Sequence, residues 1–187
     1  MILMNRIADH TASVLDFWRG DERSTHDFIC PSASFEVKGT SSRDDLKVFI
    51  SGLTQLSKEN ADNELLLYVA RVIPGKSDTS ATIESLIHKL EKKEIPTNEL
   101  MQRLSDSSVY PYLDIDKDKY SDEEFTVSEE YMYSIDEDFP KLTINDISDL
   151  NPELAKRLSE VSYQIDLSGL ENFLIKPLLY RLQQCYN

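Results

Sequence analysis

The sequence predicts one mixed α/β domain over residues 1–187, with a mixed central sheet flanked by helices. Three observations carry this prediction. The run ELLLYVARVI at 64–73 is almost continuously apolar, which is typical of a strand buried on both faces. Residues 162–167 (SYQIDL) alternate between polar and apolar, as in a strand with one buried face. Between 79 and 95, apolar side chains recur every three or four residues, as on a helix that packs against a sheet.

The first half of the chain is predicted to contain one helix followed by four strands. Residues 2–18 have a loose apolar helical face, and residues 20–25 form a turn. HDFIC (26–30) and SFEVKG (34–39) are two strands whose short connection, PSA, makes them an antiparallel hairpin. The next predicted segments are a third strand at 46–50 (LKVFI), a helical turn at 51–56 and the buried strand at 64–73, which Pro74 and Gly75 end.

The second half is predicted to be richer in helix. A helix runs from about Thr79 to Ile95, capped by Asp78, Thr79 or Ser80, and Pro96 stops it. Residues 105–140 are acidic and irregular except for a strand at 124–135. The remaining predicted elements are a helix from Thr97, a helix that begins at Asn151-Pro152-Glu153, the strand at 162–167 and a helical stretch from Ser168 that Pro177 kinks or breaks.

The charge of the chain is unevenly distributed. The net charge is −14, and residues 101–150 hold 14 acidic and 4 basic side chains, so the rest of the chain is close to neutral. A large acidic field repels nucleic-acid phosphates. It therefore argues against a dedicated DNA-binding module, although a local basic groove can coexist with a distant acidic face.

Other bulk features indicate where the protein works. No apolar run approaches the ~20 residues of a membrane span, and the start MILMNRIADH lacks the basic head and apolar stretch of a secretory signal. Cys30 and Cys185 lie far apart with no CxxC spacing. We therefore expect a reduced, cytoplasmic protein with no membrane partner.

Three charged residues stand in the predicted hairpin, where a core is expected. Because side chains alternate along a strand, Glu36 and Lys38 share one face while Phe35 and Val37 point to the other. Folding the hairpin at PSA brings Asp27 beside Glu36. Two carboxylates at one point repel each other unless a cation lies between them or one of them is protonated.

A divalent metal ion with oxygen ligands would remove this repulsion. Mg²⁺ (or Mn²⁺) suits the carboxylates of Asp27 and Glu36, and the carbonyl of Val37 could add a third ligand. Lys38 would then lie over the metal-bound water, where it can orient the water or help to deprotonate it. Such a site can hydrolyse phosphodiester bonds.

The arrangement Asp27, eight intervening residues, then Glu36-Val37-Lys38 resembles the motif of the PD-(D/E)XK nucleases. A wider order of segments resembles one bacterial group, the PD-(D/E)XK motif protein family, which is related to restriction endonucleases. These segments are FWRGDERSTHDF, FEVKGTSS, VFISGLTQL, LLLYVARV, FTVSEEYMYSIDEDFPKLT and VSYQIDLSGL, and they extend over nearly the whole chain.

The resemblance implies a restriction-endonuclease-like core and a metal-dependent endonuclease that cleaves DNA in restriction or anti-phage defence. Asp27 and Glu36 would be metal ligands and Lys38 the catalytic lysine. Gln55 would be an auxiliary polar group near the scissile phosphate, and His26 and Ser41 would contact substrate. Cleavage of both strands would need two active sites, which favours a homodimer, and the family relation separately favours a protein partner from a restriction-modification or defence system.

One feature departs from the family pattern. Nucleases of this kind often carry a Glu on the helix before the first motif strand, whereas the acids of residues 1–18 are Asp9 and Asp16. We expect either a shortened form of the domain or a partner that supplies the missing part.

Two further interpretations of the trio Asp27, Glu36 and Lys38 stay open. In one, the domain is a catalytically degenerate nuclease fold that serves as an interaction module, with its acidic block facing a protein partner. In the other, Glu36 and Lys38 form a surface ion pair worth ~0–1 kcal/mol on a purely structural domain.

Overall fold

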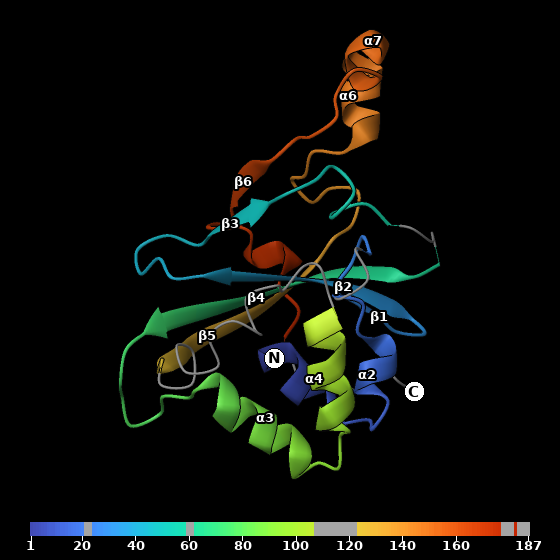
Figure 1. Cartoon of the computed structure of the whole chain (residues 1–187). Coiled ribbons are helices and arrows are strands. Elements are labelled where there is room, and N and C mark those ends of the chain that lie inside the picture. The colour runs from blue at the N-terminus through green and yellow to red at the C-terminus, as the bar shows by residue number, and fades with distance from the viewer. Residues whose placement is uncertain (21–23, 59–61, 107–122, 177–181, 183–187) are drawn as a thin grey trace.

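The computed structural model describes residues 1–20, 24–58, 62–106, 123–176 and 182, without the side chains of 104–106. Figure 1 shows three layers: helices on one side, a four-stranded sheet in the middle and a two-stranded sheet on the other side. The predicted mixed α/β class, with a mixed central sheet flanked by helices, is confirmed.

The four-stranded sheet has the order β1-β2-β4-β5. Its strands are β1 (Phe28–Ile29), β2 (Ala33–Thr40), β4 (Glu64–Pro74) and β5 (Phe125–Ser134). β1 and β2 form the predicted antiparallel hairpin, β2 and β4 run parallel, and β4 and β5 run antiparallel. Gly75, with φ of 118°, takes the chain out of β4 in a conformation that favours glycine.

β4 separates two cores because its side chains alternate between the faces of the sheet. Leu66 and Tyr68 pack into a cluster with the helices, whereas Leu65, Leu67 and Val69 pack into a second cluster under the two-stranded sheet. All five side chains are buried, which explains the nearly continuous apolar run in the sequence.

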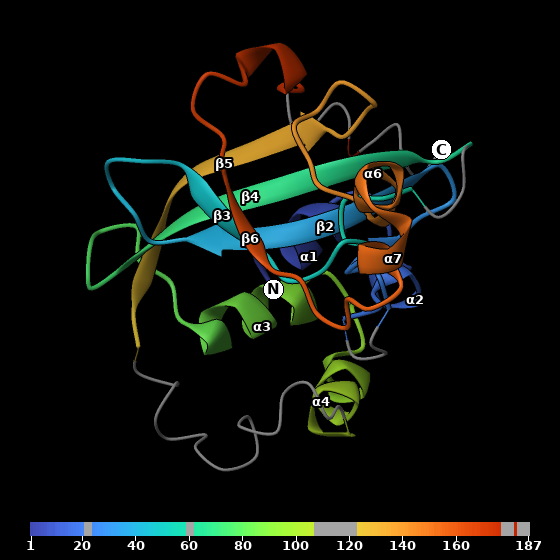
Figure 2. The same ribbon diagram turned by 90° about the horizontal axis from the view of Figure 1, so that it is seen from above.

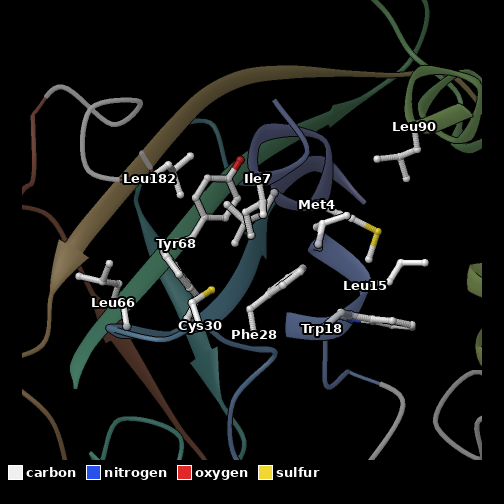
Figure 3. Close-up of a cluster of buried hydrophobic side chains, with 14 of the residues drawn as sticks. Met4, Ile7, Leu15, Trp18, Phe28, Cys30, Leu66, Tyr68, Leu90 and Leu182 are labelled. Carbon is white, nitrogen blue, oxygen red and sulfur yellow. The ribbon is translucent and has the colours of Figure 1, made fainter. Parts of the chain in front are cut away.

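The helix layer consists of α1 (Ile2–Ile7), α2 (Val14–Phe17), α3 (Ile83–Glu91) and α4 (Thr97–Asp106). Figure 3 shows side chains from α1, α2 and α3 meeting those of β1 and β4. Those labelled there include Met4, Ile7, Leu15, Phe28 and Leu90. The cluster covers the helix-facing side of the sheet with apolar groups.

Two helix predictions need correction. The expected helix over 2–18 is two short helices, because Thr11 Oγ1 accepts a hydrogen bond from Ser13 N, a local bond that competes with the helix. The helix expected from Thr79 begins later: Ala81 pairs with Phe125 in an extended bridge, and Thr82 is the actual N-cap, in a capping box with Ser85. Asp78, Thr79 and Ser80 are therefore not its caps.

The sequence predicts the elements of the third layer less accurately. β3 (Lys47–Ile50) does not join the central sheet but pairs antiparallel with β6 (Tyr163–Asp166) in a second sheet. Figure 2 shows these two strands crossing over β2 and β4. Residues 51–56 form bends and a turn in place of the expected helical turn.

Two helices between β5 and β6 project from the body (Figure 1). α6 (Ile144–Leu150) is not predicted, although Thr143 and Asp146 form a capping box at its start. α7 (Pro152–Ala155) begins as predicted, with the Asn151 side chain accepting a hydrogen bond from Leu154 N at 3.0 Å. After β6, the helical stretch expected from Ser168 is reduced, among the described residues, to the 3₁₀ helix η1 (Glu171–Phe173), because Leu174 is extended and forms a bridge with Tyr133.

Some predictions concern residues that the structure does not describe. Pro177 and Cys185 lie outside the described residues, as does the stretch 107–122 of the acidic segment. Within the described part of the chain, the structure contains no helix with the length and apolar character needed to cross a membrane.

Candidate functional site

The hairpin fixes Asp27 through its backbone and its side chain. Asp27 N donates a hydrogen bond to Phe35 O at 3.0 Å, and Arg19 N donates one to Asp27 O at 2.8 Å. The carboxylate reaches across to β2, where Asp27 Oδ2 accepts a hydrogen bond from Val37 N at 2.8 Å. The turn closes through Cys30 N and Ala33 O at 2.8 Å. Asp27 is therefore held beside Glu36, as predicted.

Glu36 and Lys38 lie on the face of β2 that the two-stranded sheet covers. Their neighbours on β4 are Leu67 and Val69, which belong to the core cluster under that sheet. Lys38 Nζ lies 2.7 Å from Glu36 Oε1, and the two side chains are only 14% and 2% exposed. The pair is thus buried between two sheets, which contradicts the reading of it as a surface ion pair.

Gln55 completes the group from the loop that follows β3. Its Oε1 accepts hydrogen bonds from Lys38 Nζ at 2.9 Å and from Ser51 N at 2.9 Å. The second bond anchors the amide to its own loop, and the first holds the ammonium group of Lys38. The structure therefore brings together Asp27, Glu36, Lys38 and Gln55, four of the residues that the sequence singles out.

The carboxylates of this group are electrostatically strained. Burial and, next, the negative charge of Asp27 raise the pKa of Glu36 to about 7 against the opposing effect of Lys38. Burial also raises the pKa of Asp27, although the hydrogen bond from Val37 and the charge of Lys38 act in the other direction. One cation, Lys38, does not compensate two buried carboxylates.

The two residues expected to contact substrate, His26 and Ser41, lie in different surroundings. His26 is 1% exposed and lines a cavity together with Ser34 and Asn63. Ser41 is exposed and follows the end of β2, three residues beyond Lys38, so it lies outside the buried group. Sequence reasoning missed Ser34 and Asn63. The alternation of β2 could have indicated Ser34, which precedes Glu36 by two residues on the same face.

Comparisons with known proteins bear on this geometry. Residues 1–168 match the model of a family described as "Putative PD-(D/E)XK family member, (DUF4420)". The chain belongs to this PD-(D/E)XK family. Searches among curated proteins and among solved structures found no match. The family assignment confirms the resemblance and agrees with the nuclease-like α/β fold.

PD-(D/E)XK nucleases generally use divalent metal ions, so the donor set of this member can be tested for fit. Within a strand, the N–H and C=O of one residue point to the same edge, so the carbonyl of Val37 lies on the edge of β2 from which its N–H donates to Asp27. Two carboxylates and a carbonyl are oxygen donors that suit Mg²⁺ or Mn²⁺ with water completing the shell. The repulsion between Asp27 and Glu36 is also what a cation would relieve.

The third acid of the usual family pattern does not come from the helices before β1. Asp9 Oδ1 lies 2.7 Å from Lys93 Nζ in an ion pair, and Asp16 is exposed on α2. Among the residues that the structure describes, no three His, Cys, Asp or Glu side chains converge as a set able to hold a metal ion. Among the described residues, the oxygen donors that could hold a metal ion here are those of Asp27, Glu36 and Val37.

Proposed function

We propose that this protein hydrolyses phosphodiester bonds of DNA with Mg²⁺ or Mn²⁺ as its cofactor. The observation that carries the proposal is the convergence of Asp27, Glu36, Lys38 and Gln55 in one group, in a chain of the PD-(D/E)XK family. The acid-rich composition does not exclude DNA, because the acidic excess is concentrated in residues 101–150, and the trio comes from residues 27–38.

Asp27, Glu36 and the carbonyl of Val37 would hold the metal ion. When bound, the ion supplies positive charge to the scissile phosphate and lowers the pKa of a water molecule. Lys38, held by Glu36 and Gln55, would direct its ammonium group to the attacking water and to the phosphate. Gln55 would position Lys38, because its own oxygen is fixed by Ser51 N.

Lysines near the group could guide the phosphate backbone. Lys58 lies in the same loop region as Gln55 and lines the cavity beside His26. Burial lowers the pKa of Lys141 and the charge of Lys58 acts in the same direction, whereas the nearby acids Asp136, Asp146 and Glu137 act against both. Lys58 is therefore the lysine beside the site that could meet a phosphate, since acids surround Lys141.

The experiment compares cleavage of supercoiled plasmid, with Mg²⁺ or Mn²⁺, by the wild type, Lys38→Ala and Lys156→Ala. Lys156, the C-cap residue of α7, is 71% exposed and serves as the matched control. Loss of a positioned proton-transfer group costs about 10²–10⁴-fold in rate, so we expect that loss for Lys38→Ala and none for Lys156→Ala. Equal cleavage by all three proteins, or none by any across plasmid, linear duplex and single-stranded substrates, contradicts the proposal.

A second candidate is a degenerate nuclease fold that acts as an interaction module in a defence complex. It is favoured by the donor set of only two carboxylates among the described residues. Calorimetry with Mg²⁺ and Mn²⁺ separates the candidates: no metal binding, together with co-purification of a defence-system protein, supports the module. A role in restriction or anti-phage defence, a cytoplasmic site of action and a homodimer that cuts both strands remain parts of the leading proposal.

A further inference from the structure

A cavity of about 210 Å³ adjoins the candidate site and has no part in the chemistry proposed above. Two of its lining residues connect it to the site: His26 precedes Asp27, and Ser34 lies on the same face of β2 as Glu36. A strand rises about 3.3 Å per residue, so Ser34 lies roughly 7 Å from Glu36. A group placed in the cavity would therefore be one nucleotide or less from a phosphate at Asp27 and Glu36.

The lining combines apolar side chains with polar groups. Ile29 and Leu65 supply the apolar surface, and His26, Ser34 and Asn63 supply the polar groups. Hydrogen-bonding side chains over an apolar surface are what a flat, uncharged heterocycle with its own donors and acceptors requires. A hydroxyl, an amide and an imidazole provide both donors and acceptors.

The charge and the size of the cavity argue against two other ligand classes. Lys58 and Glu64 both line it, so a phosphate would meet a carboxylate as well as an ammonium group. Small-molecule pockets commonly measure ≈300–1,000 Å³, so this cavity is small for a larger ligand. At about 30 Å³ per water molecule, it has room for several waters, which a single heterocyclic base could replace.

We propose that this cavity is a subsite for the nucleobase of the nucleotide next to the scissile phosphate. This inference rests on the proposed nuclease function. A base can enter such a cavity only when it is unpaired or turned out of the duplex stack. The protein therefore prefers single-stranded DNA, or DNA with unpaired bases at the cleavage point, over regular duplex.

The test is a titration of the isotopically labelled protein with the four deoxynucleosides and, separately, with inorganic phosphate, followed by NMR. We expect at least one deoxynucleoside to shift the amide signals of Ser34 and Asn63 saturably, and inorganic phosphate to leave these signals in place. Asn63→Leu fills the cavity and should weaken this binding by at least about tenfold, which corresponds to 1.4 kcal/mol. The matched control, Asn145→Leu on exposed α6, should bind as the wild type does.

Ser34→Ala is a milder second variant, which removes only a hydroxyl group in case Asn63→Leu fails to fold. It should also weaken nucleoside binding. The subsite is overturned if no deoxynucleoside shifts these signals at millimolar concentration, if phosphate alone shifts them, or if both cavity variants bind as tightly as the wild type.

Nucleosides contain no phosphate and cannot be cleaved by a phosphodiesterase, so this binding is independent of metal and of turnover. Lys38→Ala should retain it. Nucleoside binding by a protein that cleaves no DNA leaves the subsite standing and contradicts the nuclease function. Cleavage without nucleoside binding contradicts the subsite alone.

Discussion

Glu36 and Glu130 lie on opposite faces of one sheet, and each is paired with a basic side chain, yet their pKa values shift in opposite directions. Burial favours the protonated form of both. At Glu130, the hydrogen bonds from Arg6 and Tyr68 outweigh burial and leave the pKa below its usual value. At Glu36, burial and the charge of Asp27 outweigh Lys38 and raise the pKa to about 7.

The contrast lies in how many carboxylates each basic side chain serves. On the helix face, one carboxylate receives a guanidinium and a phenol, which fastens α1 to β4 and β5. On the face under β3 and β6, two carboxylates share one lysine. Perturbed titration of this kind is common at functional sites. Variants on each face can test whether burial and the sharing of one lysine cause the opposite pKa shifts of Glu36 and Glu130.

The largest effect is expected from truncating the two neighbouring leucines of β4. Leu66→Ala and Leu67→Ala each leave a cavity in a fully buried position, and each should lower the free energy of unfolding by about 2–5 kcal/mol. Only Leu67 is the cross-strand neighbour of Glu36. Denaturant unfolding measures the first effect. A carboxyl NMR titration should show the pKa of Glu36 falling in Leu67→Ala alone, because water reaches the carboxylate.

Equal pKa values for Glu36 in the two leucine variants would contradict this. In that case burial under the second sheet would not be the main cause of the shift, and the comparison of the two faces would lose its basis.

The next effect is the pH dependence of stability that Glu36 contributes. Its pKa is about 7 in the folded protein against an ordinary value of 4.5, so the folded state binds the proton more tightly. Stability from this group is therefore fully present below about pH 4.5 and is lost as the pH rises through 7. The shift corresponds to about 3 kcal/mol. We expect Glu36→Gln to remove that loss, measured by urea unfolding between pH 4.5 and pH 8.

Glu130→Gln is the matched control for this measurement. Because the pKa of Glu130 is lowered, its contribution is present at neutral pH and is lost on acidification. Because this loss lies below pH 4.5, Glu130→Gln should leave the slope between pH 4.5 and pH 8 unchanged, and removal of that slope by Glu130→Gln would refute the assignment.

A metal ion should stabilise the protein only through the face of the sheet that carries Glu36. At pH 8, Mg²⁺ or Mn²⁺ at a hundred times its dissociation constant should raise the free energy of unfolding by about 2.7 kcal/mol. The gain should shrink at pH 6, where Glu36 holds its proton. Glu36→Gln should lose it and Glu130→Gln should keep it in thermal melts with and without the ion. An unchanged gain in Glu36→Gln would place the ion elsewhere.

Much of this contrast can be predicted from the sequence, because the alternation of residues along a strand determines on which face of the sheet each side chain lies. Alternation in SFEVKG places Glu36 and Lys38 opposite Phe35 and Val37, and the PSA loop sets the hairpin that brings Asp27 beside them. Gln55 came from the resemblance to the family, and its hydrogen bond to Lys38 is found in the structure.

The remainder depends on contacts between segments far apart in the chain. The hairpin alone suggests a face open to water, whereas β3 and β6 cover it. An alternating run such as LKVFI is compatible with either sheet, because its period does not identify its partner strand. Asn63 and Lys58 lie in or beside loops, where no periodicity marks the cavity that they line.

The smallest effect is expected from removing one hydroxyl on the helix face. Tyr68 Oη donates a hydrogen bond to Glu130 Oε2 at 2.8 Å, and Tyr68→Phe removes that bond while keeping the ring in the core. A hydrogen bond to a charged group contributes about 1.5–3 kcal/mol, so we expect a loss near the lower end, since Arg6 still pairs with Glu130. The pKa of Glu130 should rise, because one of the bonds that outweigh burial is gone.

Tyr163→Phe is the control for this change, because its hydroxyl bonds to the backbone of Leu142 on the other side of the molecule. It removes a phenol in the same way, and the pKa of Glu130 should not move. Urea unfolding and a carboxyl NMR titration measure both quantities. A Glu130 pKa that stays low in Tyr68→Phe would mean that Arg6 alone outweighs burial. Lys38 would then fail to lower the pKa of Glu36 only because Asp27 is present. Repulsion between the two carboxylates would be the decisive difference between the two faces.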